Sequence, residues 1–165
     1  MIIVVMGVSG CGKSTVGADL AKHLHCDFQD ADDFHPQANK DKMSNGIPLT
    51  DEDRWPWLRA IRDYMDKEKA AGHDVVFACS ALKKVYRDLL NDKHDVHFVY
   101  LKGSEELISD RLAHRSSHFF NPKLLHSQFE TLEEPTADEG VFVVDIRNDP
   151  DTIVDIVKKE MTSWK

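Results

Sequence analysis

The segment GVSGCGKST, from Gly7 to Thr15, has the residue types and spacing of a loop that binds phosphate groups. It matches the pattern G-x-x-x-x-G-K-[ST], in which the glycines let backbone N–H groups turn toward phosphate oxygens. Lys13 is expected to reach the β- and γ-phosphates of a nucleotide and to act in catalysis, and the hydroxyl of Ser14 is expected to bind Mg²⁺. The predicted nucleotide-binding residues of this loop are Gly7, Gly10, Cys11, Gly12, Lys13, Ser14 and Thr15.

A glycine turn that merely joins a strand to a helix is the alternative interpretation of this segment. The residues on both sides argue against it. Residues 2–6 are a continuous apolar run, as expected of a strand buried on both faces. After the loop, Val16, Leu20 and Leu24 recur at the four-residue spacing of a helix. A strand before the loop and a helix after it are the context that a phosphate-binding loop requires.

Three acidic residues, Asp30, Asp32 and Asp33, follow a short strand expected to end near residue 29. Ligands of open α/β sheets gather beyond the carboxyl ends of the strands, so these acids are expected to face the γ-phosphate. One acid can join the Mg²⁺ shell and another can accept a proton from an acceptor hydroxyl. The strand over residues 75–79 ends in Cys79-Ser80 and brings no acid, which favours Asp30 for the metal. The alternative is a solvated acidic loop or a helix cap.

Basic residues come next along the chain, and each lies near a predicted helix end or loop. The planar guanidinium of arginine suits carboxylates and phosphates. Arg111 and Arg115 are four residues apart, on one face of a helix, and precede the polar stretch SSHFFNP. Residues 115–122 are a candidate lid that would close over ATP, and Arg111 and Arg115 would then bind the nucleotide and offset charge on the transferring group. Each arginine alone could equally form a surface ion pair. The basic candidates are Arg54, Lys83, Arg87, Arg111 and Arg115.

The elements that must position these residues alternate between strands and helices. Apolar runs predict strands over residues 75–79, 97–101 and 141–144. Helical spacing is seen between Trp57 and Met65, after Ser104, and in the last dozen residues. The polar segment 30–50 is interpreted as loop and short helix. This alternation predicts an α/β fold with a parallel sheet covered on both faces, in a single domain over residues 1–165.

Composition excludes several classes of protein. The chain has 165 residues and a formal net charge of -8, which disfavours binding to nucleic acid or to an anionic membrane. No apolar run approaches the roughly 18 residues of a membrane span, and we expect a cytoplasmic protein. The three cysteines are scattered, so neither a disulfide framework nor a zinc site is expected.

Nearly end to end, the sequence resembles the gluconate kinases (gluconokinases) of the small phosphate-loop type. The phosphate loop is generic to a superfamily, whereas most of the other matching segments are more specific, and their order and spacing fit. The matching segments are GVSGCGKST at residues 7–15, DADDFHP at 30–36, KMSNGIPLTDEDRWPWL at 42–58, CSALKKVYRDLL at 79–90, YLKG at 100–103, RLAHRSSHFF at 111–120 and QFETLEEP at 128–135.

This resemblance implies a fold like that of shikimate and nucleoside monophosphate kinases. Such a fold has three layers, a five-stranded parallel sheet, a mobile lid and a substrate-binding helical segment, here residues 30–58. It also implies the reaction of ATP and D-gluconate to ADP and 6-phospho-D-gluconate with Mg²⁺, which feeds the pentose phosphate pathway. Such enzymes are often homodimers.

Roles for individual residues follow from the same resemblance. Asp32 would contact the accepting hydroxyl, although the adjacent Asp33 leaves the choice of base open. After the last strand, Asn148, Asp149 and Pro150 would contact adenine. The residues implied to hold the substrate are Asp32, His35, Arg54, Lys83, Arg87 and Gln128.

The sequence departs from the family pattern at two positions. Cys11 stands in the phosphate loop where serine is common, which would make activity sensitive to oxidation if the thiol were exposed. Ser117 stands in the lid where glycine would be usual. Another kinase of this fold is the main alternative, but a shikimate kinase would show a glycine triplet where this chain has Cys79-Ser80-Ala81. A regulator without phosphoryl transfer would lack the convergent acids and arginines.

Overall fold

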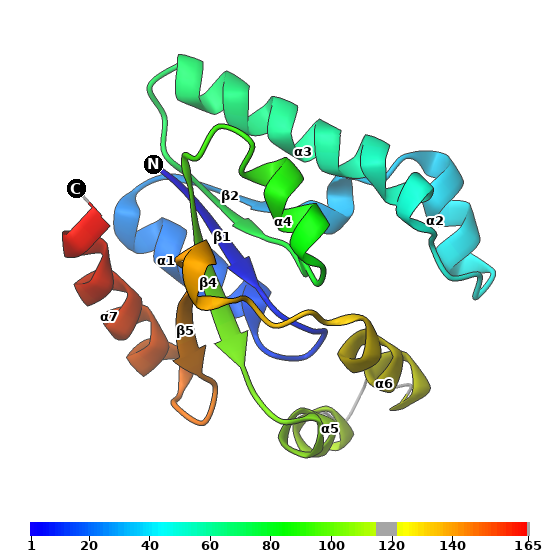
Figure 1. Cartoon of the computed structure of the whole chain (residues 1–165). Coiled ribbons are helices and arrows are strands. Elements are labelled where there is room, and N and C mark those ends of the chain that lie inside the picture. Colours follow the sequence, from blue (N-terminus) through cyan, green and yellow to red (C-terminus); the bar gives the residue numbers. More distant parts are fainter. Residues whose placement is uncertain (115–121, 165) are drawn as a thin grey trace.

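The computed structural model describes residues 1–114 and 122–164. Its core is a sheet of five parallel strands in the order β2-β3-β1-β4-β5 (Figure 1), so the predicted five-stranded parallel sheet is confirmed. The strands are β1 (Ile2–Met6), β2 (Asp27–Asp30), β3 (Val75–Ala78), β4 (Val96–Lys102) and β5 (Phe142–Asp145). Each lies within two residues of its predicted bounds.

Helices occupy most of the remaining described chain. Two of them, α4 and α6, were not predicted from the sequence. The α-helices are α1 (Lys13–Leu24), α2 (Gln37–Ser44), α3 (Asp51–Ala70), α4 (Lys84–Leu90), α5 (Glu105–Ala113), α6 (Pro122–Thr131) and α7 (Pro150–Met161). Short 3-10 turns are η1 (Ala31–Phe34), η2 (Ala137–Glu139) and η3 (Thr162–Trp164).

Strand β1 packs against helices on both faces of the sheet, and the molecule therefore has three layers. Its side chains alternate between the two faces of the sheet. Ile3 and Val5 pack into a buried cluster with residues of α1 and α7, whereas Val4 and Met6 pack into a second cluster with residues of α3 and α4. All five residues of β1 are buried, because helices cover both faces (Figure 1).

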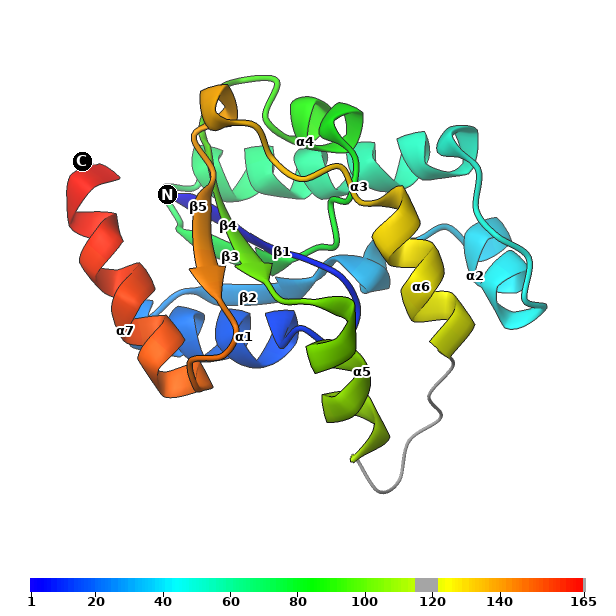
Figure 2. The same cartoon turned by 60° about the horizontal axis from the view of Figure 1, so that its bottom comes forward.

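The register of the strands brings the predicted functional residues to one edge of the sheet. Val5 of β1 and Asp30 of β2 both pair with Ala78 of β3, so the three strands end at the same level. The N–H of Gly7 donates to the carbonyl oxygen of Ser80 at 3.3 Å, which ties the phosphate loop to the loop after β3. Helices α5 and α6 lie side by side beyond the end of β4 (Figures 1 and 2).

The segment predicted as loop and short helix contains η1 and α2 and then leads into α3. Thr50 caps α3 by accepting a hydrogen bond from the N–H of Asp53, whose carboxylate accepts one in return from the N–H of Thr50. This reciprocal cap fixes where α3 begins. Most of the candidate lid, with Arg115 and Ser117, lies outside the described residues.

Arg62 stabilises the fold away from the phosphate loop. Its side chain, 5% exposed, donates to both carboxylate oxygens of Asp95, to Asp66 and to the carbonyl oxygen of Leu90. We expect Arg62→Met to lower the free energy of unfolding by about 3 kcal/mol, because it leaves partly buried carboxylates without their partner. Urea denaturation measures this. The matched control, Arg147→Met, breaks a pair whose side chains are 80% and 44% exposed, and should cost less than about 1 kcal/mol.

The ion pair between Arg62 and Asp95 also makes the free energy of unfolding depend on pH. The hydrogen bond from Arg62 holds the pKa of Asp95 well below its usual range, with Lys69 adding to this effect. A carboxyl group with a lowered pKa stabilises the fold above its unfolded pKa of about 4, and this stability is lost as the pH falls further. In Arg62→Met this acid-dependent loss should be smaller. An equal loss in both proteins would contradict the role given to Arg62.

Candidate active site

The phosphate loop leaves the first turn of α1 open to an anion. Gly12 precedes the helix in the left-handed conformation, with a φ of 98°, and no side chain caps the helix start. The N–H groups of Lys13, Ser14 and Thr15 have no hydrogen-bond partner among the described residues. Unpaired N–H groups at the positive end of a helix dipole are a binding site for phosphate.

Gly10 lets another helix approach the loop closely. Its φ is +82°, and an added Cβ would lie 2.8 Å from a methyl carbon of Leu112 in α5. Both the backbone conformation and the contact therefore require glycine at this position. The helix that leads to the candidate lid thus packs directly on the phosphate loop.

Two side chains of the loop are turned inward. The ammonium group of Lys13 donates to the carbonyl oxygen of Val8 at 3.0 Å, a contact that has to break when it reaches a phosphate. The thiol of Cys11 is buried, and burial raises its pKa. The condition for oxidation sensitivity, an exposed Cys11, is therefore not met.

Asp30 and Ser14 supply oxygen atoms that suit Mg²⁺. A carboxylate oxygen of Asp30 lies 3.5 Å from the hydroxyl oxygen of Ser14, and its other oxygen accepts the N–H of Asp32 at 3.0 Å. Mg²⁺ is usually held by one or two protein groups together with phosphate oxygens, and this pair fits that pattern. No group of three His, Cys, Asp or Glu side chains within the described part of the chain would hold a metal by itself.

Asp32 has the electrostatic surroundings of a base. The pKa of its carboxyl is raised, first by loss of solvation and then by the neighbouring charge of Asp30, and Lys13 opposes this shift. The residue as a whole still reaches solvent. A raised pKa brings a carboxylate closer to the proton affinity that general-base catalysis at neutral pH requires. Asp30, which accepts the N–H of Asp32 and lies 3.5 Å from the hydroxyl of Ser14, places Asp32 beside the phosphate loop.

Two predicted cations, Arg54 and Lys83, both contact Tyr86. The sequence did not single out Tyr86 as a site residue. The guanidinium of Arg54 donates to the hydroxyl of Tyr86 at 3.2 Å and lies 5.4 Å from the ring centre. Lys83 donates to Asp51 at 3.0 Å, and Asp51 also accepts from the hydroxyl of Tyr86. The starts of α3 and α4 therefore present two positive charges together. In the sequence, the signal for the role of Tyr86 was its position three residues after Lys83, which precedes α4.

His35 lies close to this basic group. Burial, followed by the charges of Arg54 and Lys40, lowers the pKa of its imidazole to about 4, so the ring is neutral at physiological pH. It stacks on the indole of Trp57. A neutral imidazole can hydrogen-bond a substrate but adds no charge to the site.

Gln128 of α6 is bonded to the phosphate loop. Its side-chain oxygen accepts the N–H of Ser9 at 2.6 Å, and its amide nitrogen lies 2.8 Å from the hydroxyl oxygen of Ser9. The sequence suggested a substrate contact for Gln128. The structure joins it to the segment that would hold the phosphates, and the substrate contact stays a prediction.

Arg87 requires a correction. Its side chain is 1% exposed and is surrounded by protein acceptors. It donates to the carboxylate of Glu139 and to the carbonyl oxygens of Ala81, Leu82 and Glu133. No N–H remains for a substrate, so the expected direct contact does not fit this structure. Arg87 instead holds the loop that ends at Lys83.

Arg111 and the predicted adenine-binding residues occupy the same corner of the molecule. The guanidinium of Arg111 donates to the carbonyl oxygen of Ile146 at 2.6 Å. Directly after it, Asn148 donates to the carbonyl oxygen of Asp145, Asp149 caps α7, and Pro150 is the first residue of that helix. This loop follows β5, at the same end of the sheet as the phosphate loop.

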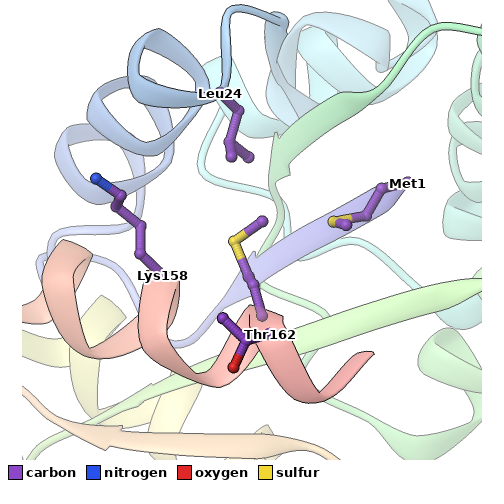
Figure 3. A pocket seen from close by; sticks show the side chains of 5 residues that line it. Met1, Leu24, Lys158 and Thr162 are labelled. Atoms are coloured by element: carbon purple, nitrogen blue, oxygen red, sulfur yellow. The ribbon is translucent and has the colours of Figure 1, made fainter. Parts of the chain in front are cut away.

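A small surface pocket lies elsewhere, at the other end of β1 (Figure 3). Met1, Leu24, Lys158, Met161 and Thr162 line it. Met1 directly precedes β1, whereas the phosphate loop follows that strand. Ligands of open α/β sheets bind at the carboxyl ends of the strands, so this pocket is not part of the candidate site.

Comparisons with known proteins agree with this geometry. The family model described as shikimate kinase matches residues 9–158. The chain is 46% identical to the thermoresistant gluconokinase of Escherichia coli K12, over 96% of this chain and 94% of the relative. It is 48% identical to a probable gluconokinase of Xenopus tropicalis, over 98% and 93%.

The solved structures that resemble this chain also include a gluconokinase and a shikimate kinase. A gluconokinase from Sinorhizobium meliloti superposes with a TM-score of 0.83 at 46% identity, covering 93% of this chain and 86% of that one. The shikimate kinase of Aquifex aeolicus superposes with a TM-score of 0.61 at 18% identity, covering 99% and 97%. At that identity, the second comparison shows the shared fold alone.

Proposed function

We propose, since the chain belongs to the gluconokinases within the shikimate kinase family, that it transfers the γ-phosphoryl group of ATP to D-gluconate. The products are ADP and 6-phospho-D-gluconate, which feeds the pentose phosphate pathway. The observation that carries this proposal is that Arg54 and Lys83 both contact Tyr86. They lie near the acidic loop, residues 30–33, whose Asp30 lies 3.5 Å from Ser14 of the phosphate loop. An acceptor with a carboxylate and several hydroxyls matches these groups.

The nucleotide phosphates bind the free N–H groups at the start of α1. The ammonium group of Lys13 leaves the carbonyl oxygen of Val8 and pairs with the β- and γ-phosphates. Ser14 and Asp30 would hold Mg²⁺, which neutralises charge on the phosphates when bound. Asn148, Asp149 and Pro150 contact adenine in this proposal.

The acceptor binds between the acidic loop and the starts of α3 and α4. Arg54 and Lys83 hold its carboxylate, and His35 hydrogen-bonds one of its oxygens. The carboxylate of Asp32 takes the proton of the attacking hydroxyl, whose oxygen forms the new bond to phosphorus as the bond to ADP breaks. Arg111 and Arg115 stabilise the charge of the transferring group when the lid, residues 115–122, closes.

The substrate is tested by a panel assay. ADP release from ATP and Mg²⁺ is measured with D-gluconate, its epimers, shikimate and nucleoside monophosphates. We expect turnover with gluconate, and a ³¹P spectrum with the phosphoryl group on its terminal hydroxyl. Turnover of another acceptor but not of gluconate would overturn the proposed substrate and leave phosphoryl transfer in place.

A cytoplasmic location and a homodimer also belong to this proposal, and the homodimer rests on the resemblance to the family. Within the described residues, no helix is long and apolar enough to cross a membrane. Sedimentation equilibrium of the purified protein tests the dimer, because a single species of one-chain mass at micromolar concentration would contradict it.

A further inference from the structure

The imidazole of His35 is held between α2 and α3 directly after the acidic loop. Its ring stacks on the indole of Trp57, with centroids 4.3 Å apart and an angle of 13° between the planes. The residue is 8% exposed. Stacking fixes the plane of the ring. The hydrogen bonds within that plane therefore determine which ring nitrogen donates and which accepts.

The side-chain amide of Asn39, four residues later, determines which ring nitrogen carries the proton. Its nitrogen lies 2.8 Å from the carbonyl oxygen of Asp53 and 3.2 Å from Nδ1 of His35. A carbonyl oxygen only accepts hydrogen bonds, so the NH₂ group and not the amide oxygen must face it. The second N–H of Asn39 then points to Nδ1, which must accept it. The proton of the neutral ring is therefore on Nε2.

The N–H at Nε2 remains free for a ligand. It has no partner among the described residues, and no fully buried side-chain nitrogen or oxygen within them lacks one. Nε2 therefore reaches solvent. Arg54 directly follows Asp53, whose carbonyl oxygen accepts from Asn39, so His35 lies near this cation. The ring is neutral because burial, followed by the charges of Arg54 and Lys40, lowers its pKa to about 4.

We propose that Asn39 is a positioning residue that fixes His35 as an Nε2–H donor to an oxygen of the acceptor. The identity of that acceptor rests on the proposed function, whereas the hydrogen-bond chain from Asp53 through Asn39 to His35 does not. In this arrangement His35 donates a hydrogen bond and does not remove the proton of the attacking hydroxyl. The base is then one of the carboxylates of the acidic loop.

Nitrogen-15 NMR of the intact protein tests the chain without any substrate. At pH 7 the imidazole nitrogens of His35 should have the shifts of a neutral ring protonated at Nε2, the resonance being assigned by its absence in His35→Gln. In Asn39→Leu, these shifts should move toward a mixture of the two tautomers. A ring protonated mainly at Nδ1 in the natural protein, or unchanged shifts in Asn39→Leu, would overturn the proposal.

Steady-state kinetics test whether the Nε2–H group of His35 contributes to binding of the acceptor. Loss of one hydrogen bond should raise the KM for the acceptor in Asn39→Leu by about 3-fold to 10-fold, while kcat and the KM for ATP change less than about 2-fold. The control is Lys42→Met, which removes another contact between α2 and Asp53, from Nζ at 2.8 Å, without touching the imidazole. If Lys42→Met raises the acceptor KM as much as Asn39→Leu does, Asn39 only anchors α2 and the proposal fails.

Two substitutions of His35 keep the proposal testable if Asn39→Leu does not fold. The amide nitrogen of glutamine can take the place of Nε2, whereas that of asparagine falls closer to Nδ1. His35→Gln should therefore keep a lower acceptor KM than His35→Asn, and the reverse order would contradict a donor at Nε2. These KM values are measured with whichever acceptor the panel assay identifies, so a wrong substrate is distinguished from a wrong role for Asn39.

Discussion

Replacing Lys13 by alanine is expected to lower kcat by about 10²-fold to 10³-fold, the usual effect of removing one group that stabilises transition-state charge. The ammonium group lies at the start of α1, where the free N–H groups would hold phosphates, and among the described residues it donates to the carbonyl oxygen of Val8. Without it, charge that develops on the β- and γ-phosphates loses a positive partner. Initial rates of ADP formation at saturating ATP and gluconate measure the effect.

Lys22→Ala is the matched control for this prediction. Lys22 is an exposed lysine in the last turn of the same helix, far along α1 from the phosphate loop. Its replacement should leave kcat within about 2-fold, because surface charges away from a site contribute little. If Lys13→Ala retained a kcat similar to that of Lys22→Ala, the ammonium group of Lys13 would have no role in transfer.

Replacing Asp32 by asparagine is expected to lower kcat by about 10²-fold to 10⁴-fold, the usual contribution of a general base. Asparagine has nearly the same shape and keeps the backbone N–H that Asp30 accepts, so the acidic loop should stay in place. Only the ability to take a proton is lost. Stopped-flow measurement of the chemical step separates this loss from any change in product release.

The pH dependence gives a second measurement of the same role. A base works only when it is ionised, so activity should fall as the pH drops through the pKa of Asp32. Loss of solvation, with Asp30 adding to it, raises this pKa, so the fall should begin above the range of an ordinary aspartate. In Asp32→Asn the remaining activity should not show this acidic limb.

Asp33→Asn is the control, because Asp33 is the adjacent acid in the same turn and is exposed like Asp32. It should retain most of the kcat. A large loss in Asp33→Asn together with near-normal activity in Asp32→Asn would assign the base to Asp33. The sequence left this choice open, and the structure favours Asp32 because loss of solvation and the charge of Asp30 raise the pKa of its carboxyl.

Features that depend on neighbouring residues could be predicted from the sequence. The phosphate loop was evident because its glycines, Lys13 and Ser14 act within one short segment. Strand β1 was evident because burial on both faces requires a continuous apolar run. The sheet followed from repeated strands and helices, and the acidic loop from its place after β2. Each of these patterns is local and has a fixed period or spacing.

Contacts between side chains that lie far apart in the sequence could not be predicted and are seen in the folded structure. Arg87 and Glu139 are 52 residues apart, and their ion pair makes Arg87 a structural residue where a substrate contact was expected. Gln128 meets Ser9 across 119 residues, and Asn39 meets the carbonyl oxygen of Asp53 across 14. Hydrogen bonds need two partners within about 3 Å. Such a distance is set by the packing of whole helices and strands, which no local pattern of residues contains.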